Sequence, residues 1–437
     1  MFNKKTIRDV YLRGKTVLLR ADYNVPIEYL ESGDARILSN FRVRASLPTL
    51  RFLIEAGVKK IVLISHLGRP ESFNNLSEFA RAERLENGDL KFSMRPVFDE
   101  LRILLAAEMG RNLLMNFHPV PIFPETKFFT SLKDSPDNYK IEMLENLRFF
   151  KGEKKNSPEF AQKLLEITGA DLFIQDGFGV IHREHTSTSA ITQILPSVAG
   201  FLLEREVSTI FKALRSPSLP LSVVMGGAKI SDKLPLVENF IDKSDNLILG
   251  GALANTFLDF YNFEVGKSKI EAEQDQVILQ VESRARAKFG EGFRKKFILP
   301  TEFGVSKEFS KTAPRKPANL NQIQKDDIIL DIGEDYAKYC AKILKNSKTI
   351  MWNGTLGVSE LDNFSVGSEI IAESISEATR NGATSIIGGG DTSAFALKYL
   401  EENPEVGKFS LISTGGGAAL ELMSGKNLPG LDALQDK

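Results

Sequence analysis

The chain has 437 residues, of which 42% are hydrophobic and 26% charged, and its formal net charge is −1. Single cores stop growing at roughly 250–300 residues, so we expect two domains. A net charge near zero gives no general attraction to nucleic acid or to anionic membranes, so any anion-binding surface must be local. The first ten residues lack the apolar core of a signal peptide, and no run approaches the roughly 18 apolar residues that span a bilayer. We therefore expect a cytoplasmic protein.

Short apolar runs alternate with helical patterns along the chain, which predicts parallel α/β sheets with helices on both faces. In the first half, four runs end in polar or charged side chains. These runs are 16–26, 60–70, 143–149 and 171–185, and they supply Arg20, Asp22, Asn24, His66, Gly68, Arg69, Arg148, Asp176, His182, Arg183 and His185. Ligands of open α/β sheets gather outside the carboxyl ends of strands, so we expect these groups to converge on a compact, strongly anionic ligand. The alternative for each arginine is an exposed residue in a weak salt bridge.

Two segments interrupt this alternation. The polar span 71–92 is expected to be a surface excursion. Residues 196–216 have the helical spacing of apolar residues and are followed by Pro217. We expect a long helical connector, across which domain closure would exclude water. The alternative is an ordinary core helix.

In the second half, six apolar runs end on glycine. They lie within 221–233, 246–257, 328–333, 349–357, 385–392 and 410–419. The most informative of these runs is 385–392, in which a short apolar stretch is followed by Gly388–Gly390, then by Asp391 and Thr392, and then by a predicted helix. A glycine-rich helix N-terminus can hold an anion on its free N–H groups. Because Asp391 would repel phosphate unless Mg²⁺ lay between them, the pattern favours a Mg–nucleotide site over a structural turn.

Other signals narrow the enzyme class. The single cysteine, Cys340, excludes an internal disulfide and lies in an apolar helix-like run, so we expect a core residue rather than a nucleophile. The chain has no GxxxxGK[ST] P-loop and no GxGxxG opening its first βα unit. P-loop enzymes are therefore disfavoured, and a Rossmann-type dehydrogenase is kept as the alternative from another enzyme class.

Nine motifs occur in the order seen in phosphoglycerate kinases, and the chain resembles that family over essentially its whole length. They are RADYNVP (20–26), SHLGRP (65–70), MLENLRF (143–149), DGFGVIHREHTS (176–187), GGAKISDK (226–233), WNGTLG (352–357), GGGDT (388–392), STGGGA (413–418) and LPG (428–430). The resemblance implies an α/β fold with two Rossmann-like domains, each with a parallel sheet, joined by a helical hinge around a central cleft. It implies a glycerate-binding domain over 1–200, a Mg-nucleotide-binding domain over 201–420, and a tail over 421–437 that packs on the first domain.

The resemblance also implies reversible phosphoryl transfer between 1,3-bisphosphoglycerate and ADP, giving 3-phosphoglycerate and ATP with Mg²⁺. Residues matching the family's glycerate-binding positions are Asp22, Asn24, Arg42, His66, Gly68, Arg69, Arg148 and Arg183. Residues matching its nucleotide-binding positions are Gly227, Ala228, Lys233, Gly251, Asn353, Glu360, Gly389, Gly390, Asp391 and Thr392, with Asp391 as the Mg²⁺ ligand. Groups matching those that act on the migrating phosphoryl are Arg42, Lys229, Gly390 and Gly416.

The sequence departs from the family pattern at several positions. Thr355 replaces the proline of WNGPMG, and Ser359 replaces the phenylalanine before Glu360, so these positions bear on nucleotide affinity and preference. Further departures are Phe150, Gly177, Thr301, Glu302 and Glu334. None removes a charged group that the chemistry needs, which disfavours the alternative of a catalytically silent, nucleotide-binding paralogue. We expect a monomer with small-molecule substrates and no nucleic-acid or membrane partner.

Overall fold

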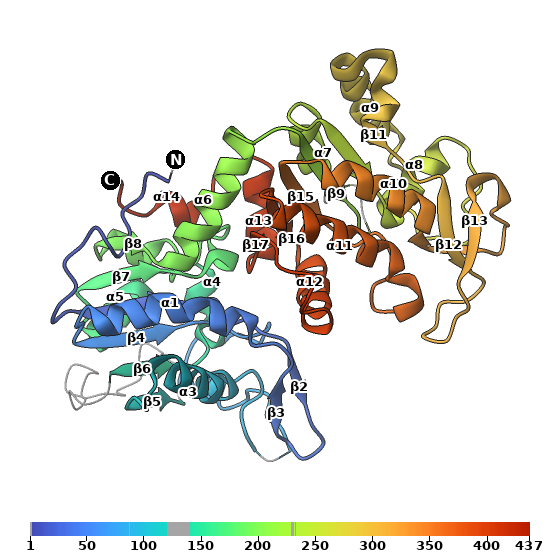
Figure 1. Cartoon of the computed structure of the whole chain (residues 1–437). Helices are drawn as coiled ribbons and strands as arrows, with labels where there is room; N and C mark the ends of the chain where they lie inside the picture. The colour runs from blue at the N-terminus through green and yellow to red at the C-terminus, as the bar shows by residue number, and fades with distance from the viewer. Residues whose placement is uncertain (1, 87, 120–139, 229–230, 232) are drawn as a thin grey trace. The chain divides into compact units, whose positions relative to one another are not determined.

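The computed structural model describes residues 2–86, 88–119, 140–228, 231 and 233–437 (Figure 1). The chain divides into two compact units. Unit 1 consists of Met1–Ser208 and Asn427–Lys437, and unit 2 consists of Thr209–Lys426. Each unit is built on a six-stranded sheet, which confirms the expected α/β class. Within the described part of the chain, no helix is both long and apolar enough to cross a bilayer.

The sheet of unit 1 is parallel throughout and has the order β5-β6-β4-β1-β7-β8. Its strands are β1 (Thr16–Arg20), β4 (Lys60–Ile64), β5 (Met115–His118), β6 (Ile141–Leu144), β7 (Leu172–Gln175) and β8 (Ser197–Ala199). Successive side chains of a strand point to opposite faces. Accordingly, Val17 and Leu19 of β1 join one core cluster and Leu18 joins the other. Both faces are therefore buried, as a parallel sheet requires.

Helices cover both faces of this sheet (Figure 1). Buried residues of α1 (Phe41–Glu55) and α3 (Arg95–Met109) join the first cluster, and those of α5 (Pro158–Thr168) join the second. Unit 1 also contains short elements, among them β2 (Ile27–Tyr29), β3 (Ala35–Ile37), α2 (Leu76–Phe79), α4 (Lys151–Lys154) and α14 (Pro429–Asp432). Strands β2 and β3 form an antiparallel hairpin outside the main sheet.

The main sheet of unit 2 is also parallel, with the order β11-β10-β9-β15-β16-β17. Its strands are β9 (Leu221–Met225), β10 (Asn246–Leu249), β11 (Phe297–Ile298), β15 (Thr349–Asn353), β16 (Thr384–Gly388) and β17 (Leu411–Ile412). The helices are α7 (Leu234–Ile241), α8 (Gly251–Phe260), α9 (Asp275–Phe289), α10 (Glu334–Lys345), α11 (Val366–Arg380), α12 (Gly390–Glu402) and α13 (Gly416–Met423). Cys340 of α10 is fully buried in this core, as expected, and burial raises the pKa of its thiol to about 12.

One predicted strand lies elsewhere than expected. The run 328–333 was predicted to join the parallel sheet, but β14 (Ile328–Ile332) pairs antiparallel with β12 (Glu302–Ser306). Together with β13 (Lys316–Asn319), these strands form a small sheet over a separate core cluster. The position at the edge of the main sheet is taken by β11, whose two residues are too short a run to be recognised in the sequence.

The two segments that interrupt the alternation also differ in part from expectation. Residues 197–199 form β8, and the connecting helix α6 (Phe201–Arg215) begins only after it. Asp176 Oδ1 accepts hydrogen bonds from the first-turn N–H groups of Leu202 and Leu203, at 2.9 and 3.3 Å, and α6 continues across the boundary between the units. The excursion 71–92 lies only partly on the surface, because it buries Phe73 and Phe79 in the second core cluster of unit 1.

Candidate active site

The carboxyl end of β1 is tied to the start of α1 and to the loop after β4. Arg42 Nη1 lies 2.9 Å from Asp22 Oδ2 and donates to the carbonyl of Asn24 at 3.2 Å. Asn24 Oδ1 accepts the N–H of Gly68 at 2.7 Å. His66 Nδ1 lies 4.0 Å from Asp22 Oδ1. Five predicted glycerate-binding residues are thus brought together at the carboxyl ends of the central strands of this sheet.

Arg148 joins this group from the 3₁₀ turn that follows β6. Its Nη1 donates to the carbonyl of Gly68 at 2.6 Å. Burial and, to a lesser degree, the neighbouring charges of Arg183 and Arg20 together lower the pKa of Arg148 to about 10. Like charges held this close repel one another, so a negatively charged ligand would stabilise the cluster.

His66 is buried at the centre of these cations. Burial lowers its pKa well below the usual value, and the charges of Arg20, Arg148, Arg42 and Arg183 add to that shift. His66 is therefore a neutral imidazole at neutral pH. Of the two exposed arginines, Arg183 donates through Nε to His182 Nε2 at 3.0 Å, and Arg69 follows Gly68 at the surface.

Arg20 does not have the ligand-binding position that its strand-end location predicted. It is only 1% exposed, and its guanidinium donates to Ser187 Oγ at 2.9 Å, to Ser65 Oγ at 3.2 Å and to the carbonyl of Ala21. The same guanidinium donates to His66 Nδ1 at 3.0 Å. Arg20 is therefore an internal part of the site, occupied by protein partners. The sequence shows that an arginine follows an apolar run, but not that its side chain folds back into the core.

In unit 2, one cavity of about 350 Å³ collects the residues predicted to bind phosphate. Its lining includes Gly227, Ala228, Lys233, Asn353, Gly389, Gly390, Asp391, Thr392 and Gly416. Helix α12 begins at Gly390 and α13 at Gly416, so the N-termini of two helices line the same cavity. Free N–H groups and the helix dipole favour an anion there. Lys229 lies outside the described residues.

Side chains complete the polar wall of this cavity. Lys233 Nζ donates to Asn353 Oδ1. The Nδ2 of Asn353 is buried, and among the described residues no acceptor lies within hydrogen-bond reach of it. A Cβ built on Gly389 would lie 3.3 Å from this nitrogen, so the amide points at the glycine loop. The Thr392 hydroxyl accepts the N–H of Gly354 at 2.7 Å, which fixes the loop after β15 against α12.

The loops after β9 and β15 approach each other so closely that only glycine fits. A Cβ on Gly226 would lie 2.1 Å from the carbonyl oxygen of Thr355, and one on Gly354 would lie 2.2 Å from that of Gly226. Gly354 also has φ +94°, a conformation that L residues rarely adopt. The N–H of Gly227 donates to Thr355 O at 2.9 Å. Backbone atoms therefore form this side of the cavity.

A second cavity of unit 2, of about 750 Å³, shares Gly227, Ala228, Thr355 and Asp391 with the first. Its lining also includes Gly251 and Glu360, and its apolar wall is formed by Leu330, Ile332, Leu356 and Val358. A ligand with a flat apolar end and a charged chain would fit the two cavities together. All ten predicted nucleotide-binding residues line one or both of them.

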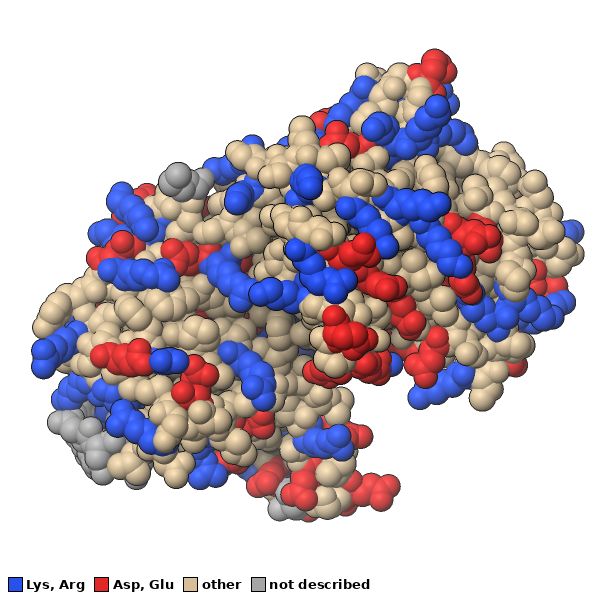
Figure 2. Space-filling model, in the orientation of Figure 1, with Lys and Arg blue, Asp and Glu red and all other residues tan. Residues whose placement is uncertain are grey.

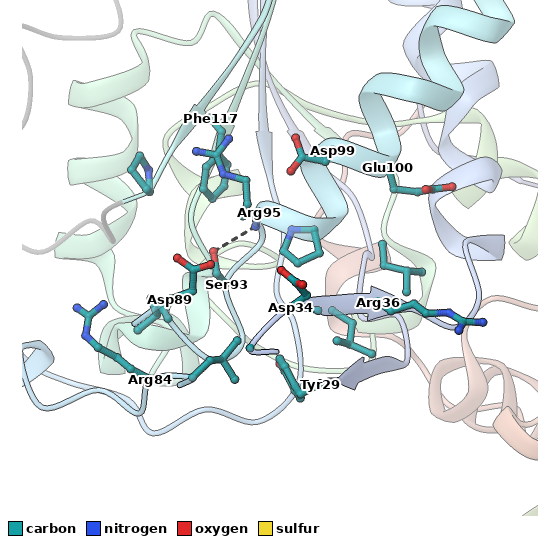
Figure 3. A pocket seen from close by; sticks show the side chains of 18 of the residues that line it. Tyr29, Asp34, Arg36, Arg84, Asp89, Ser93, Arg95, Asp99, Glu100 and Phe117 are labelled. Carbon is teal, nitrogen blue, oxygen red and sulfur yellow. Dashed lines mark hydrogen bonds between the residues drawn. The ribbon is translucent and has the colours of Figure 1, made fainter. Parts of the chain in front are cut away.

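A third cavity, of about 670 Å³, lies in unit 1 between the β2–β3 hairpin, residues 84–85 and 88–90, and α3 (Figure 3). The Arg95 guanidinium lies over the Phe117 ring, 4.6 Å from its centroid. The charged lining consists of Asp34, Asp89, Asp99, Glu100 and Glu145 against Arg36, Arg84 and Arg95. This surplus of acids disfavours a strongly anionic ligand. The candidate glycerate site therefore remains the group at the carboxyl ends of the unit 1 strands, called the strand-end cluster here, which consists of Asp22, Asn24, Arg42, His66, Gly68, Arg69, Arg148 and Arg183.

Comparison with known proteins agrees with this arrangement. The family model described as phosphoglycerate kinase matches residues 7–426. A phosphoglycerate kinase of Akkermansia muciniphila is 38% identical over 99% of this chain and 98% of its own. The solved phosphoglycerate kinase of Coxiella burnetii matches with a TM-score of 0.77 at 31% identity, and that of Pyrococcus horikoshii OT3 with 0.73 at 27%, each covering 98% of both chains. The chain therefore belongs to the phosphoglycerate kinase family.

Proposed function

We propose that the two units divide the reaction of this glycolytic kinase between them. Unit 1 binds 3-phosphoglycerate or 1,3-bisphosphoglycerate at the strand-end cluster, and unit 2 binds ATP or ADP with Mg²⁺ in its two connected cavities. The observation that carries the proposal is the 350 Å³ cavity of unit 2, which two helix N-termini, Lys233 and Asp391 line. The 750 Å³ cavity with its apolar wall lies beside it. The reaction itself follows from family membership. The contacts within each unit support the assignment of one substrate to each unit.

The glycerate substrate carries carboxylate and phosphate groups, for which guanidinium groups are the favoured partners. Arg42 and Arg148 are anchored by Asp22 and by the Gly68 carbonyl, which restricts their side chains before substrate binds. Arg69 and Arg183 are exposed at the same edge and can reach a ligand from solvent. Asn24 shapes the loop by holding Gly68.

Asp391 is the proposed Mg²⁺ ligand. It is exposed in the first turn of α12, where an unpaired carboxylate would repel a phosphate chain. In the described ranges, no three His, Cys, Asp or Glu side chains are grouped to hold a metal ion. Mg²⁺ commonly binds through one carboxylate, substrate phosphates and water, so this single acid fits the ion. When bound, Mg²⁺ neutralises charge on the phosphate chain.

No general base is required in the direction that consumes ATP. The attacking carboxylate is already ionised near neutrality, because such groups titrate at about pH 4. The residues therefore have to align donor and acceptor and to stabilise charge on the migrating phosphoryl. We assign this role to Arg42, Lys229 and the N–H groups of Gly390 and Gly416. Glu360 is assigned to the ribose, and Gly227, Ala228 and Gly251 to the wall of the adenine site.

The proposal includes a monomeric enzyme of the cytoplasm whose units close around α6, which continues from one unit into the other. The net charge of −1 and the interspersed charges on the face shown in Figure 2 support the absence of a nucleic-acid partner. The silent paralogue is disfavoured because the charged groups of the site are retained. Detectable NAD(H) binding would instead favour the dehydrogenase.

A coupled assay tests the proposal. Purified protein is mixed with MgATP and 3-phosphoglycerate, and glyceraldehyde-phosphate dehydrogenase with NADH reports the acyl phosphate formed. Turnover that saturates with each substrate supports the kinase activity. Loss of that turnover in Asp391→Ala supports the assignment of Asp391 as the Mg²⁺ ligand. No turnover with intact MgADP binding would identify a silent paralogue, and Thr355 and Ser359 would be the first positions to revert.

A further inference from the structure

A chain of hydrogen bonds leads from a buried carboxylate to the imidazole of His66. Glu153, in α4, is 1% exposed, and its Oε1 accepts the Ser187 hydroxyl at 2.6 Å. Ser187 Oγ in turn accepts Arg20 Nε–H at 2.9 Å. Arg20 Nη2 lies 3.0 Å from His66 Nδ1. Four residues from separate segments of unit 1 are thereby connected without an intervening gap.

The direction of every bond in this chain follows from chemistry. A carboxylate only accepts, so the Ser187 hydroxyl must donate its proton to Glu153, and its oxygen lone pairs are left to accept from Arg20. A guanidinium only donates, so His66 Nδ1 must be the acceptor at the other end. A neutral imidazole that accepts at Nδ1 carries its proton on Nε2. The tautomer of His66 is thus determined by Arg20.

The position of the Arg20 guanidinium in turn depends on Glu153, through the Ser187 hydroxyl that joins them. Burial lowers the pKa of Arg20, and the charges of Glu153 and Asp22 oppose that shift. Asp22 also pairs with Arg42 at 2.9 Å, so Glu153 is the counter-ion less engaged with a second arginine. Glu153 accepts the Ser187 N–H at 3.1 Å, and its carbonyl accepts the Thr186 N–H at 2.9 Å. These bonds fix the segment that carries the link to Arg20.

The charged groups around His66 make this tautomer useful. They come from β1 and the residues after it (Arg20, Asp22), from α1 (Arg42), and from the segments carrying Arg148 and Arg183. An anionic ligand among these cations needs further donors, and Nε2–H provides one without adding a fifth like charge. The other tautomer would present a lone pair at Nε2 to a ligand oxygen, which is repulsive.

We propose that Glu153 is a positioning residue, which acts through Ser187 and Arg20 to hold His66 as the neutral Nε2–H tautomer that donates to the glycerate substrate. The proposal rests on the proposed function for the identity of the ligand, but the tautomer itself is a property of the free enzyme. Loss of the Glu153 charge should therefore affect glycerate binding and leave nucleotide binding unchanged.

The test compares Glu153→Gln with wild type and with Glu159→Gln, an exposed carboxylate on the next helix. Losing a hydrogen bond to a charged group should raise the KM for 3-phosphoglycerate about tenfold or more, with the KM for MgATP unchanged. Glu153→Asp, which keeps the charge, should recover part of the loss, and Glu159→Gln should match wild type. If Glu153→Gln does not fold, Ser187→Ala breaks the same link and should show the same split in KM.

A second readout is independent of activity. In protein labelled with ¹⁵N-histidine, two-bond ¹H–¹⁵N spectra assign the tautomer of each imidazole, and His66→Gln identifies the His66 signals. We expect the Nε2–H form in wild type and a mixture or loss of that form in Glu153→Gln. A wild-type tautomer together with a wild-type KM in both Glu153→Gln and Ser187→Ala would overturn the proposal. Absence of turnover in wild type would instead overturn the proposed function, while the spectra would still decide the role of Glu153.

Discussion

Arg42 and Asp22 form an ion pair at 2.9 Å in which the carboxylate is buried and the guanidinium is partly open, with side-chain exposures of 2% and 26%. One side of the guanidinium is held by the protein, and the rest remains accessible. Fixing an arginine in this way reduces the conformational entropy lost when it binds a ligand. The pair therefore supports the fold and leaves a positive charge accessible to a ligand.

Removing this guanidinium should damage catalysis more than folding. We expect Arg42→Ala to lower kcat by about 10²-fold or more, because a positioned charge on the migrating phosphoryl is lost. Some stability should also be lost, since Asp22 keeps a buried charge without its partner. Arg44→Ala, an exposed arginine of the same helix, is the matched control and should retain wild-type kcat. Equal kcat for both variants in steady-state assays would remove Arg42 from the reaction.

The metal assignment can be tested by binding alone. Asp391→Ala should weaken MgADP binding strongly and leave Mg-free ADP binding unchanged or slightly tighter, because the carboxylate attracts the ion and repels the phosphates. Calorimetric titrations with and without Mg²⁺ measure the affinities for MgADP and for Mg-free ADP. Glu401→Ala, an exposed acid later in α12, is the control. If Asp391→Ala weakens both forms of ADP equally, the residue does not act through the metal.

The close contact between the loops after β9 and β15 predicts that alanine substitutions at two glycines of unit 2 differ in their effect on stability. Gly354 and Gly382 have nearly the same φ, +94° and +91°, but a Cβ on Gly354 would lie 2.2 Å from Gly226 O, whereas Gly382 faces open space. Gly382→Ala should cost about 1–2 kcal/mol for the left-handed backbone alone. Gly354→Ala should lower the melting temperature further and abolish MgADP binding. Similar melting temperatures for the two variants would show that the loops can separate without cost.

His185 predicts part of the pH dependence of stability. Burial, with a further contribution from the charge of Arg148, lowers its folded-state pKa to about 4. The unfolded chain, with a histidine pKa of about 6.5, takes up the proton first, so folding loses stability as the pH falls from about 6.5 toward 4. His185→Asn should therefore reduce the fall in melting temperature between pH 7.5 and 5. Glu184→Gln, its exposed neighbour, should follow the wild-type curve; parallel curves for His185→Asn and wild type would contradict the assignment.

The strand-end residues could be predicted because each follows an apolar run directly. Asp22, His66 and Arg148 lie at neighbouring strand ends, so a parallel sheet brings them together with no further information. Arg42 could not be found in this way. It lies on α1, and its approach to Asp22 depends on how that helix packs against the sheet, which only the family resemblance anticipated.

The parts that could not be predicted depend on long-range pairing and on burial. The run 328–333 has the composition of a sheet strand, but it pairs antiparallel with β12, from which β13 and its connections separate it along the chain, and hydrophobic pattern does not determine that choice. The inward turn of Arg20 depends on Ser187 and Glu153, which lie more than 130 residues away. The role of Lys229 stays a prediction, because it lies outside the described residues.

Residues 427–437 belong to unit 1, where the Gly430 N–H donates to Ile181 O and Lys4 pairs with Asp436. A ribosome makes the chain in order, so these residues emerge only after the whole of unit 2. Unit 1, although translated first, cannot acquire these contacts until unit 2 has been synthesised. During synthesis the unit begun first is thus completed last, and a nascent chain can finish unit 2 before unit 1.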